Sequence, residues 1–92
     1  MKFEWDDKKS LVNKSKHGID FSKAIEMWRD DNRLEIQAPY PLEERSILIG
    51  KIDKKLWTAI FTYRGDDIRI ISVRRSRKKE ERLYEKKECY YG

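Results

Sequence analysis

The chain has 92 residues, of which 42% are charged and 12% are aromatic, and its formal net charge is +5. A chain of this length is expected to form one small domain over residues 1–92 with a single core, which excludes an active site in a deep cleft between two domains. The aromatic content is typical of a folded chain and not of a disordered one.

The positive charge is concentrated in the second half of the chain. Residues 1–45 hold nine Lys and Arg against ten Asp and Glu, whereas residues 46–92 hold thirteen against seven. A local basic surface attracts polyanions, and nucleic acid is the commonest of these. No basic amphipathic helix with a bulky apolar face accompanies the charge, which argues against binding to a membrane. Solubilisation of a small domain is the simpler alternative explanation.

Cysteine content and the amino-terminal sequence bear on where the protein acts. Cys89 is the one cysteine, so an intrachain disulfide and a cysteine metal cluster are excluded. The amino-terminal segment has no apolar core of a signal peptide, and no segment approaches the ~20 apolar residues of a membrane span. We therefore expect a cytoplasmic protein without a membrane partner.

The first half of the chain predicts a short extended segment followed by two helices. Residues 2–6 alternate between aromatic and charged side chains, which is typical of a short strand or an extended arm. Residues 7–17 follow an aspartate suited to cap a helix, and Gly18 is a standard helix stop. Asp20 opens a second predicted helix over residues 21–30, whose apolar residues recur at helical spacing and should face a core.

The second half of the chain predicts a sheet followed by a helix. The runs rich in β-branched and aromatic residues are 33–37, 45–52, 56–64 and 68–74. Short connections between them predict an antiparallel meander. A last helix is predicted over residues 78–91. The order of elements indicates an α+β fold in which amino-terminal helices pack on a twisted, mainly antiparallel sheet, with a further helix at the carboxyl end.

Arginines recur along the predicted strands, at Arg45, Arg64, Arg69 and Arg74. The planar fork of donors on arginine suits phosphate oxygens, and several forks on one patch could hold a scissile phosphate. Strict alternation along the last strand would place Arg74 on one face and Arg69 on the other. The alternative explanation is a set of ordinary ion pairs at the sheet edge, with the acidic residues Glu43, Glu44, Asp66 and Asp67.

The common catalytic residue sets are absent from this sequence. His17 is the one histidine, and no phosphate-cradling glycine loop, nucleophile elbow or metal-ligand spacing is present. An enzyme with this sequence would therefore use carboxylate, arginine and tyrosine, with no metal and no cofactor. His17 falls in the last turn of a helix, where an interaction with the helix dipole is the simpler explanation.

Four segments occur in order along about residues 2–85, namely KFEWD, KHGI, EERSILIGK and TYRGDDIRIISVRRS. In sequence and spacing they resemble the BrnT family of type II toxins. The resemblance implies a RelE-like fold and a ribonuclease that arrests translation. It also implies neutralisation by a BrnA-type antitoxin whose ribbon-helix-helix part binds operator DNA, so that the toxin reaches that DNA only through its antitoxin. The family's recurring arginines and acidic position correspond to Arg45, Arg64, Arg69, Arg74 and Glu44.

The resemblance implies cleavage of RNA by attack of a 2′-hydroxyl on the adjacent phosphate, with no metal. Arginine supplies positive charge, but its pKa of roughly 12 or more makes it a poor base and a poor acid. Glu44 is therefore the candidate base, and Tyr63 or Tyr84 is the candidate proton donor. The residues expected to bind the RNA are Arg75, Arg77, Lys78, Lys79 and Tyr84.

Two alternatives stay open at this point. The chain could be a module that binds RNA or the ribosome without cutting, or a degenerate toxin that serves as a corepressor with its antitoxin. If the ribonuclease interpretation holds, Arg64→Ala and Arg74→Ala should abolish toxicity without changing the melting temperature.

Overall fold

A computed structural model of the chain describes residues 2–37 and 44–91, and it describes side chains up to residue 86. In chain order its elements are β1 (Phe3–Glu4), α1 (Asp7–His17), α2 (Phe21–Ala24), the 3-10 helix η1 (Ile25–Arg29), β2 (Leu34–Gln37), β3 (Ser46–Ile52), β4 (Lys55–Arg64), β5 (Asp67–Arg75) and α3 (Lys78–Tyr91). The predicted α+β class and the order of elements are confirmed.

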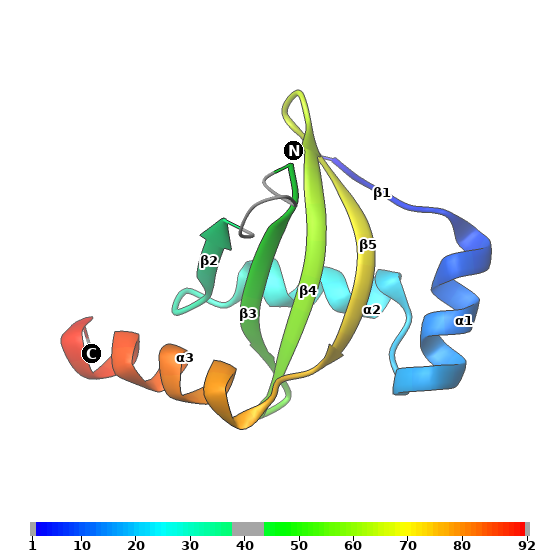
Figure 1. The fold of residues 1–92 in the computed structure, drawn as a ribbon. Helices are drawn as coiled ribbons and strands as arrows, with labels where there is room; N and C mark the ends of the chain where they lie inside the picture. Colours follow the sequence, from blue (N-terminus) through cyan, green and yellow to red (C-terminus); the bar gives the residue numbers. More distant parts are fainter. Residues whose placement is uncertain (1, 38–43, 92) are drawn as a thin grey trace.

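The strands form one five-stranded sheet in the order β1-β5-β4-β3-β2 (Figure 1). β2, β3, β4 and β5 are joined as the predicted antiparallel meander, and β1 adds to β5 in parallel. α2 passes behind the sheet in the view of Figure 1, α1 lies beside β5, and α3 starts below the ends of β4 and β5. None of the helices within residues 2–37 and 44–91 is long and apolar enough to cross a membrane.

Local sequence signals explain the helix ends. The Asp6 carboxylate accepts hydrogen bonds from the backbone N–H groups of Lys8 and Lys9, at 2.8 and 3.3 Å, and so caps α1. Gly18 ends α1 in the left-handed region, at φ 78°, which glycine adopts without strain.

The helix predicted over residues 21–30 is in fact two short pieces, α2 and η1. The tighter 3-10 turn places residues three apart above one another, and Ala24 and Met27 are both fully buried against the sheet. Gly50 of β3 lies directly beneath, where an added Cβ would come within 3.0 Å of the Met27 carbonyl oxygen. The absence of a side chain at Gly50 therefore lets η1 cross the sheet closely.

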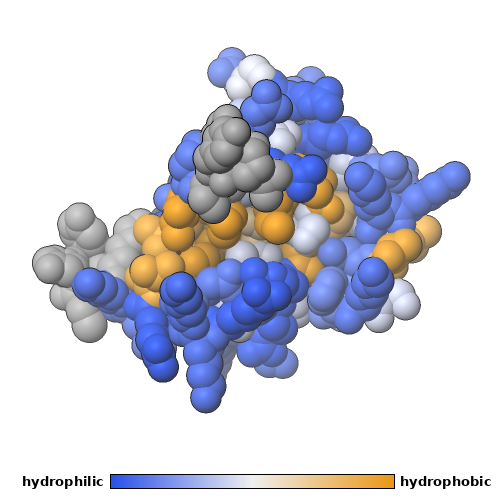
Figure 2. Space-filling view, in the orientation of Figure 1, coloured by the Kyte–Doolittle hydropathy of each residue, from blue (hydrophilic) through white to orange (hydrophobic). Residues whose placement is uncertain are grey.

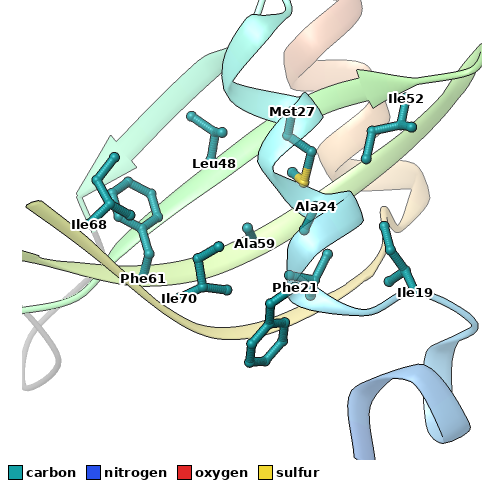
Figure 3. Close-up of a cluster of buried hydrophobic side chains, with 11 residues drawn as sticks. Ile19, Phe21, Ala24, Met27, Leu48, Ile52, Ala59, Phe61, Ile68 and Ile70 are labelled. Atoms are coloured by element: carbon teal, nitrogen blue, oxygen red, sulfur yellow. The ribbon is translucent and has the colours of Figure 1, made fainter. Parts of the chain in front are cut away.

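The face of the sheet beneath α2 and η1 carries the main core (Figure 3). Its buried members are Ile19, Phe21, Ala24, Met27, Leu48, Ile52, Ala59, Phe61, Ile68, Ile70 and Val73. Trp28 of η1 packs edge-on against Phe61, with 5.2 Å between ring centroids. We call this the covered face.

The opposite face, which we call the open face, is only partly covered. α3 packs on β3, where Tyr84 forms a smaller buried cluster with Ile49 and Leu56. On β4 and β5, Ile60 and Ser72 of this face stay partly exposed. Figure 2 shows this side of the molecule, with a hydrophobic band across its centre and hydrophilic side chains around it. The open face is therefore where the sheet itself can meet a ligand.

Candidate functional site

A β-bulge in β5 decides which side chains reach the open face. Ile70 pairs with Phe61 and Ser72 pairs with Ile60, so Ile71 is an extra residue between two successive pairs. An extra residue reverses the alternation of side chains beyond it and bends the strand. The two halves of β5 therefore present side chains in opposite phase.

This bulge places both strand arginines on the open face. Beyond the bulge it is Val73 that joins the buried core, and Arg74 lies across from Thr58 of β4. Before the bulge, Arg69 lies across from Thr62. The prediction that Arg69 and Arg74 lie on opposite faces is wrong, because strict alternation does not allow for the extra residue.

At the carboxyl end of β5, Arg74 is locked to Glu80 of α3. Its Nη1 and Nη2 atoms each lie 2.7 Å from one carboxylate oxygen of Glu80. Glu80 also accepts the backbone N–H of Arg77 at 2.7 Å, as the third residue of a helix does in a capping box. Burial raises the pKa of Glu80, but the hydrogen bonds from Arg74 and Arg77 outweigh it and lower this pKa to about 2. The carboxylate is therefore charged and a weak base.

At the other end of the β4–β5 hairpin, Arg64 and Arg69 meet beside β1. The Oε1 atom of Glu4 lies 3.8 Å from Arg64 Nε and 3.7 Å from Arg69 Nη1. These distances are too long for hydrogen bonds. The side chains are 63% and 34% exposed respectively, so the two guanidinium groups can donate to a phosphate. Arg64 and Arg69 therefore lie close together, on either side of one carboxylate oxygen.

Glu44 lies in the turn before β3, followed by the exposed Arg45. A surface groove of about 450 Å³ contains Gln37, Glu44, Ser46, Thr62, Tyr63 and Arg64. The Tyr63 hydroxyl donates to Glu35 Oε2 at 2.7 Å. Burial and then this hydrogen bond raise the pKa of Tyr63 to about 12, so the phenol stays protonated. The groove therefore brings together the candidate base, one candidate donor and one arginine.

The arginines fall into two groups and not into one cluster. Arg69 and Arg74 are five residues apart on β5, a separation of roughly 15 Å at the usual rise of a strand. One phosphate group cannot contact both. The open face therefore carries a row of arginines, which we call the arginine row. Its Arg64 and Arg69 end keeps donors available to a phosphate, whereas its Arg74 end is paired with Glu80.

The expected nucleic-acid contacts at the carboxyl end differ in their exposure. Arg77, Lys78 and Lys79 are exposed at the start of α3. Arg75 stacks on Trp57, with the guanidinium carbon 5.4 Å from the ring centroid. These cations remain on the surface.

Tyr84 does not lie where the sequence interpretation requires. Its side chain is only 1% exposed, and its hydroxyl donates to Asp30 Oδ2 at 2.7 Å. The ring is therefore unavailable for stacking on a base, and the hydroxyl is engaged inside the protein. Tyr84 anchors α3, and its proposed roles as a contact residue and a proton donor do not fit its burial.

Among the described residues, the acidic groups near Arg64, Arg69 and Arg74 are not the ones that the ion-pair explanation named. Arg74 pairs with Glu80, while Arg64 and Arg69 approach Glu4. Glu43, one of the expected partners, lies outside the described residues. The sequence analysis does not predict the role of Glu80, because hydrophobic periodicity gives no information about a charged residue on a helix with a weak apolar stripe. Its position as the third residue of α3 was the available clue.

Among residues 2–37 and 44–91, where side chains are described up to residue 86, no group of three His, Cys, Asp or Glu is placed to hold a metal ion.

Comparison with protein families identifies a match over residues 5–80 to the family described as the ribonuclease toxin BrnT of type II toxin-antitoxin systems. No curated protein matches the chain. The matched region covers most of the chain, including β5 and both groups of arginines, and the chain therefore belongs to the BrnT family of ribonuclease toxins of type II toxin-antitoxin systems.

Proposed function

We propose that the open face is the site of RNA cleavage, by attack of a 2′-hydroxyl on the adjacent phosphate and without a metal ion. The observation that carries this proposal is the placement of Arg64, Arg69 and Arg74 along one partly exposed side of the β4–β5 hairpin. Fixed cations beside a phosphate stabilise the charge that develops on its oxygens during the displacement. Cleavage of messenger RNA in the cytoplasm would then arrest translation.

The two groups of arginines have different roles in this proposal. Arg64 and Arg69 make no hydrogen bond to Glu4, so their donors are available to the scissile phosphate. Arg74 forms a neutral pair with Glu80 and holds the start of α3 against the sheet. It supports the site and adds less charge to it.

Proton transfer is assigned to the groove that contains Glu44 and Tyr63. Glu44 is exposed beside Arg64, where a carboxylate can accept the proton of the attacking hydroxyl. Tyr63 keeps its proton at neutral pH because its pKa is about 12. Its side chain is on the covered-face side of β4, as Phe61 is two residues earlier, and the groove holds it together with Thr62 and Arg64 of the open face. It can therefore donate to the leaving oxygen of an RNA that passes around this end of the sheet, when it turns away from Glu35. Positioning of the RNA contributes the rest of the rate enhancement.

The proposed partner is a BrnA-type antitoxin with a ribbon-helix-helix part. In the proposed complex only the antitoxin contacts operator DNA, through this part. We also propose that the fold of this chain is related to the fold of RelE. Apolar residues of β2, β3 and α3 flank the arginine row, including Ile47 and the 42% exposed Leu83. A surface with an apolar part and a basic part suits an inhibitor that presents apolar and acidic side chains.

The experiment is cleavage of a labelled RNA by the purified protein, in EDTA and in magnesium. Equal cleavage in both, with products ending in a 2′,3′-cyclic phosphate, is the expected result. Activity that disappears in EDTA and returns with magnesium would contradict the metal-free mechanism. RNA binding without cleavage would favour the non-catalytic alternatives.

A further inference from the structure

A second groove lies between α1 and the bulged part of β5. It has a volume of about 340 Å³ and is lined by Lys8, Lys9, Val12, Asn13, Lys16, His17, Ile71 and Ser72. The proposed cleavage site uses none of these residues. We call its apolar lining residues, Val12 and Ile71, the apolar floor, and its lysines, Lys8, Lys9 and Lys16, the basic rim.

The apolar floor exists because α1 packs through polar residues. Asn13 is 6% exposed, and its side-chain amide donates to the Val73 carbonyl at 2.8 Å while its oxygen accepts the Val73 N–H at 3.1 Å. Ser10 is also buried and accepts the backbone N–H of Phe21 at 3.0 Å. With its polar side against the protein, α1 leaves Val12 53% exposed. Figure 2 shows a small hydrophobic patch over α1, with hydrophilic side chains beside it.

The charge of the rim is not neutralised within the described part of the chain. The ion pairs found there use Lys23, Arg64, Arg69 and Arg74, and none involves Lys8, Lys9 or Lys16. Three lysines around one apolar floor make a surface complementary to an anion with a hydrophobic part.

The groove borders the open face at Ser72. Ser72 lies across from Ile60 on the open face, between Arg69 and Arg74 in the strand, and it also lines the groove. A strand of RNA on the open face can therefore continue past Ser72 toward the lysines of α1.

We infer that the groove binds one nucleotide of the RNA next to the cleavage site, with its base on Val12 and Ile71 and its phosphates at Lys8, Lys9 and Lys16. This inference rests on the proposed function. The volume is near the lower end of the range for small-ligand sites, ~300–1,000 Å³, which suits a single nucleotide. The two apolar side chains of the floor are few for anchoring a helix of a protein partner.

The first test measures binding of a 2′-O-methyl RNA, which lacks the attacking hydroxyl, over a range of salt concentrations. Lys8→Ala/Lys16→Ala should weaken binding and reduce the slope of log K against log salt by about 1.4, at ~0.7 per phosphate contact on a single strand. The control is Lys14→Ala/Lys55→Ala, which has the same net charge and changes lysines of a different groove. The control should keep the wild-type slope.

The second test separates the base contact from the phosphate contacts. Val12→Ser should weaken binding several-fold and leave the salt slope unchanged, because it removes apolar contact and no charge. The matched control is Leu11→Ser, which changes the neighbouring residue, 72% exposed and outside the groove. Leu11→Ser should bind RNA as the wild type does.

The outcomes distinguish this inference from the proposed function. If the wild type binds and cleaves RNA but the Lys8/Lys16 variant keeps the wild-type affinity and slope, the groove inference is wrong and the proposed function stands. If the wild type neither binds nor cleaves RNA, the proposed function itself fails. If the Lys8/Lys16 variant loses affinity for the antitoxin and none for RNA, the groove belongs to the antitoxin and the inference is overturned.

Discussion

The two ends of β5 hold their arginines in different ways. Arg74 is 24% exposed and makes two 2.7 Å bonds to one carboxylate, whereas Arg69 is 34% exposed and comes no closer than 3.7 Å to Glu4. A bidentate pair fixes geometry and cancels charge, while a loose approach leaves the donors available. The same residue type on the same strand therefore supports the fold at one end and is suited to meet a ligand at the other.

The largest effect is expected on the cleavage rate, from a change of Arg69, whose guanidinium group makes no hydrogen bond to Glu4. Arg69→Ala should reduce the cleavage rate by about 10²–10³-fold, as expected when a donor to the developing charge is removed. The melting temperature should hardly change, because an exposed pair contributes at most about 1 kcal/mol. Arg69→Lys keeps the positive charge but loses the planar set of donors, so its cleavage rate should lie between those of Arg69→Ala and the wild type. An Arg69→Ala protein that cleaves at the wild-type rate would remove Arg69 from the site.

The next largest effect is expected on stability, from a change of Arg74, which is paired with Glu80. Arg74→Ala should lower the free energy of unfolding by about 2–3 kcal/mol, since it leaves the Glu80 carboxylate partly buried without its main partner. This changes the expectation from the sequence that Arg74 is dispensable for stability. Thermal denaturation of Arg74→Ala and Arg64→Ala in parallel measures this difference, and Arg74→Ala should lose more stability than Arg64→Ala.

A double variant identifies the cause of that loss. Arg74→Ala/Glu80→Gln removes both charges and should recover part of the stability lost in Arg74→Ala. If the stability lost in the double variant equals or exceeds the sum of the losses in the two single variants, the two side chains do not stabilise each other and the pair is not what supports α3.

The acid dependence of stability tests the same pair. The pKa of Glu80 falls from 4.5 to about 2 on folding, so its contribution is complete above about pH 4.5 and is lost as the pH falls toward 2. Allowing for solvent screening, the contribution is about 2 kcal/mol. Denaturant unfolding of Glu80→Gln should show a flatter stability profile than the wild type between these pH values. Identical profiles would mean that the pair adds no stability.

The smallest effect concerns the anchor of α3. Tyr84→Phe removes the hydrogen bond to Asp30 and should cost about 1 kcal/mol. RNA affinity should stay unchanged, because the side chain is buried. A loss of RNA affinity in Tyr84→Phe, at a concentration where the protein is folded, would return Tyr84 to the binding surface.

The sequence predicted the elements well because their signals are local. Asp6 and Gly18 mark the ends of α1 through capping and a left-handed residue. β-branched runs with short connections define β2 to β5, and the charge asymmetry indicated the basic half. Each of these signals depends on neighbours along the chain and not on distant contacts.

Two placements were not predicted correctly, for different reasons. The bulge lies at the Ile70–Ile71 doublet, where the apolar positions of the run shift from 68 and 70 to 71 and 73. Strict alternation over the whole strand ignores this shift, so the face of Arg74 was assigned wrongly. Tyr84 looks like a surface residue on a weak apolar stripe until Asp30 is placed beside it. The role of Tyr84 depends on a partner far away in the sequence, whereas the face of Arg74 depends on a local shift in the apolar pattern.

Asn13 also closes a sheet edge that could otherwise recruit other molecules. β1 covers β5 only at Ile68 and Arg69, and beyond them the Asn13 amide takes the place of a neighbouring strand by bonding both backbone groups of Val73. Uncovered edges pair with strands of other chains and promote aggregation. A single amide side chain therefore blocks strand addition next to the arginine row. The other edge of the sheet is formed by β2, only four residues long, and short edge strands are poor templates for such pairing.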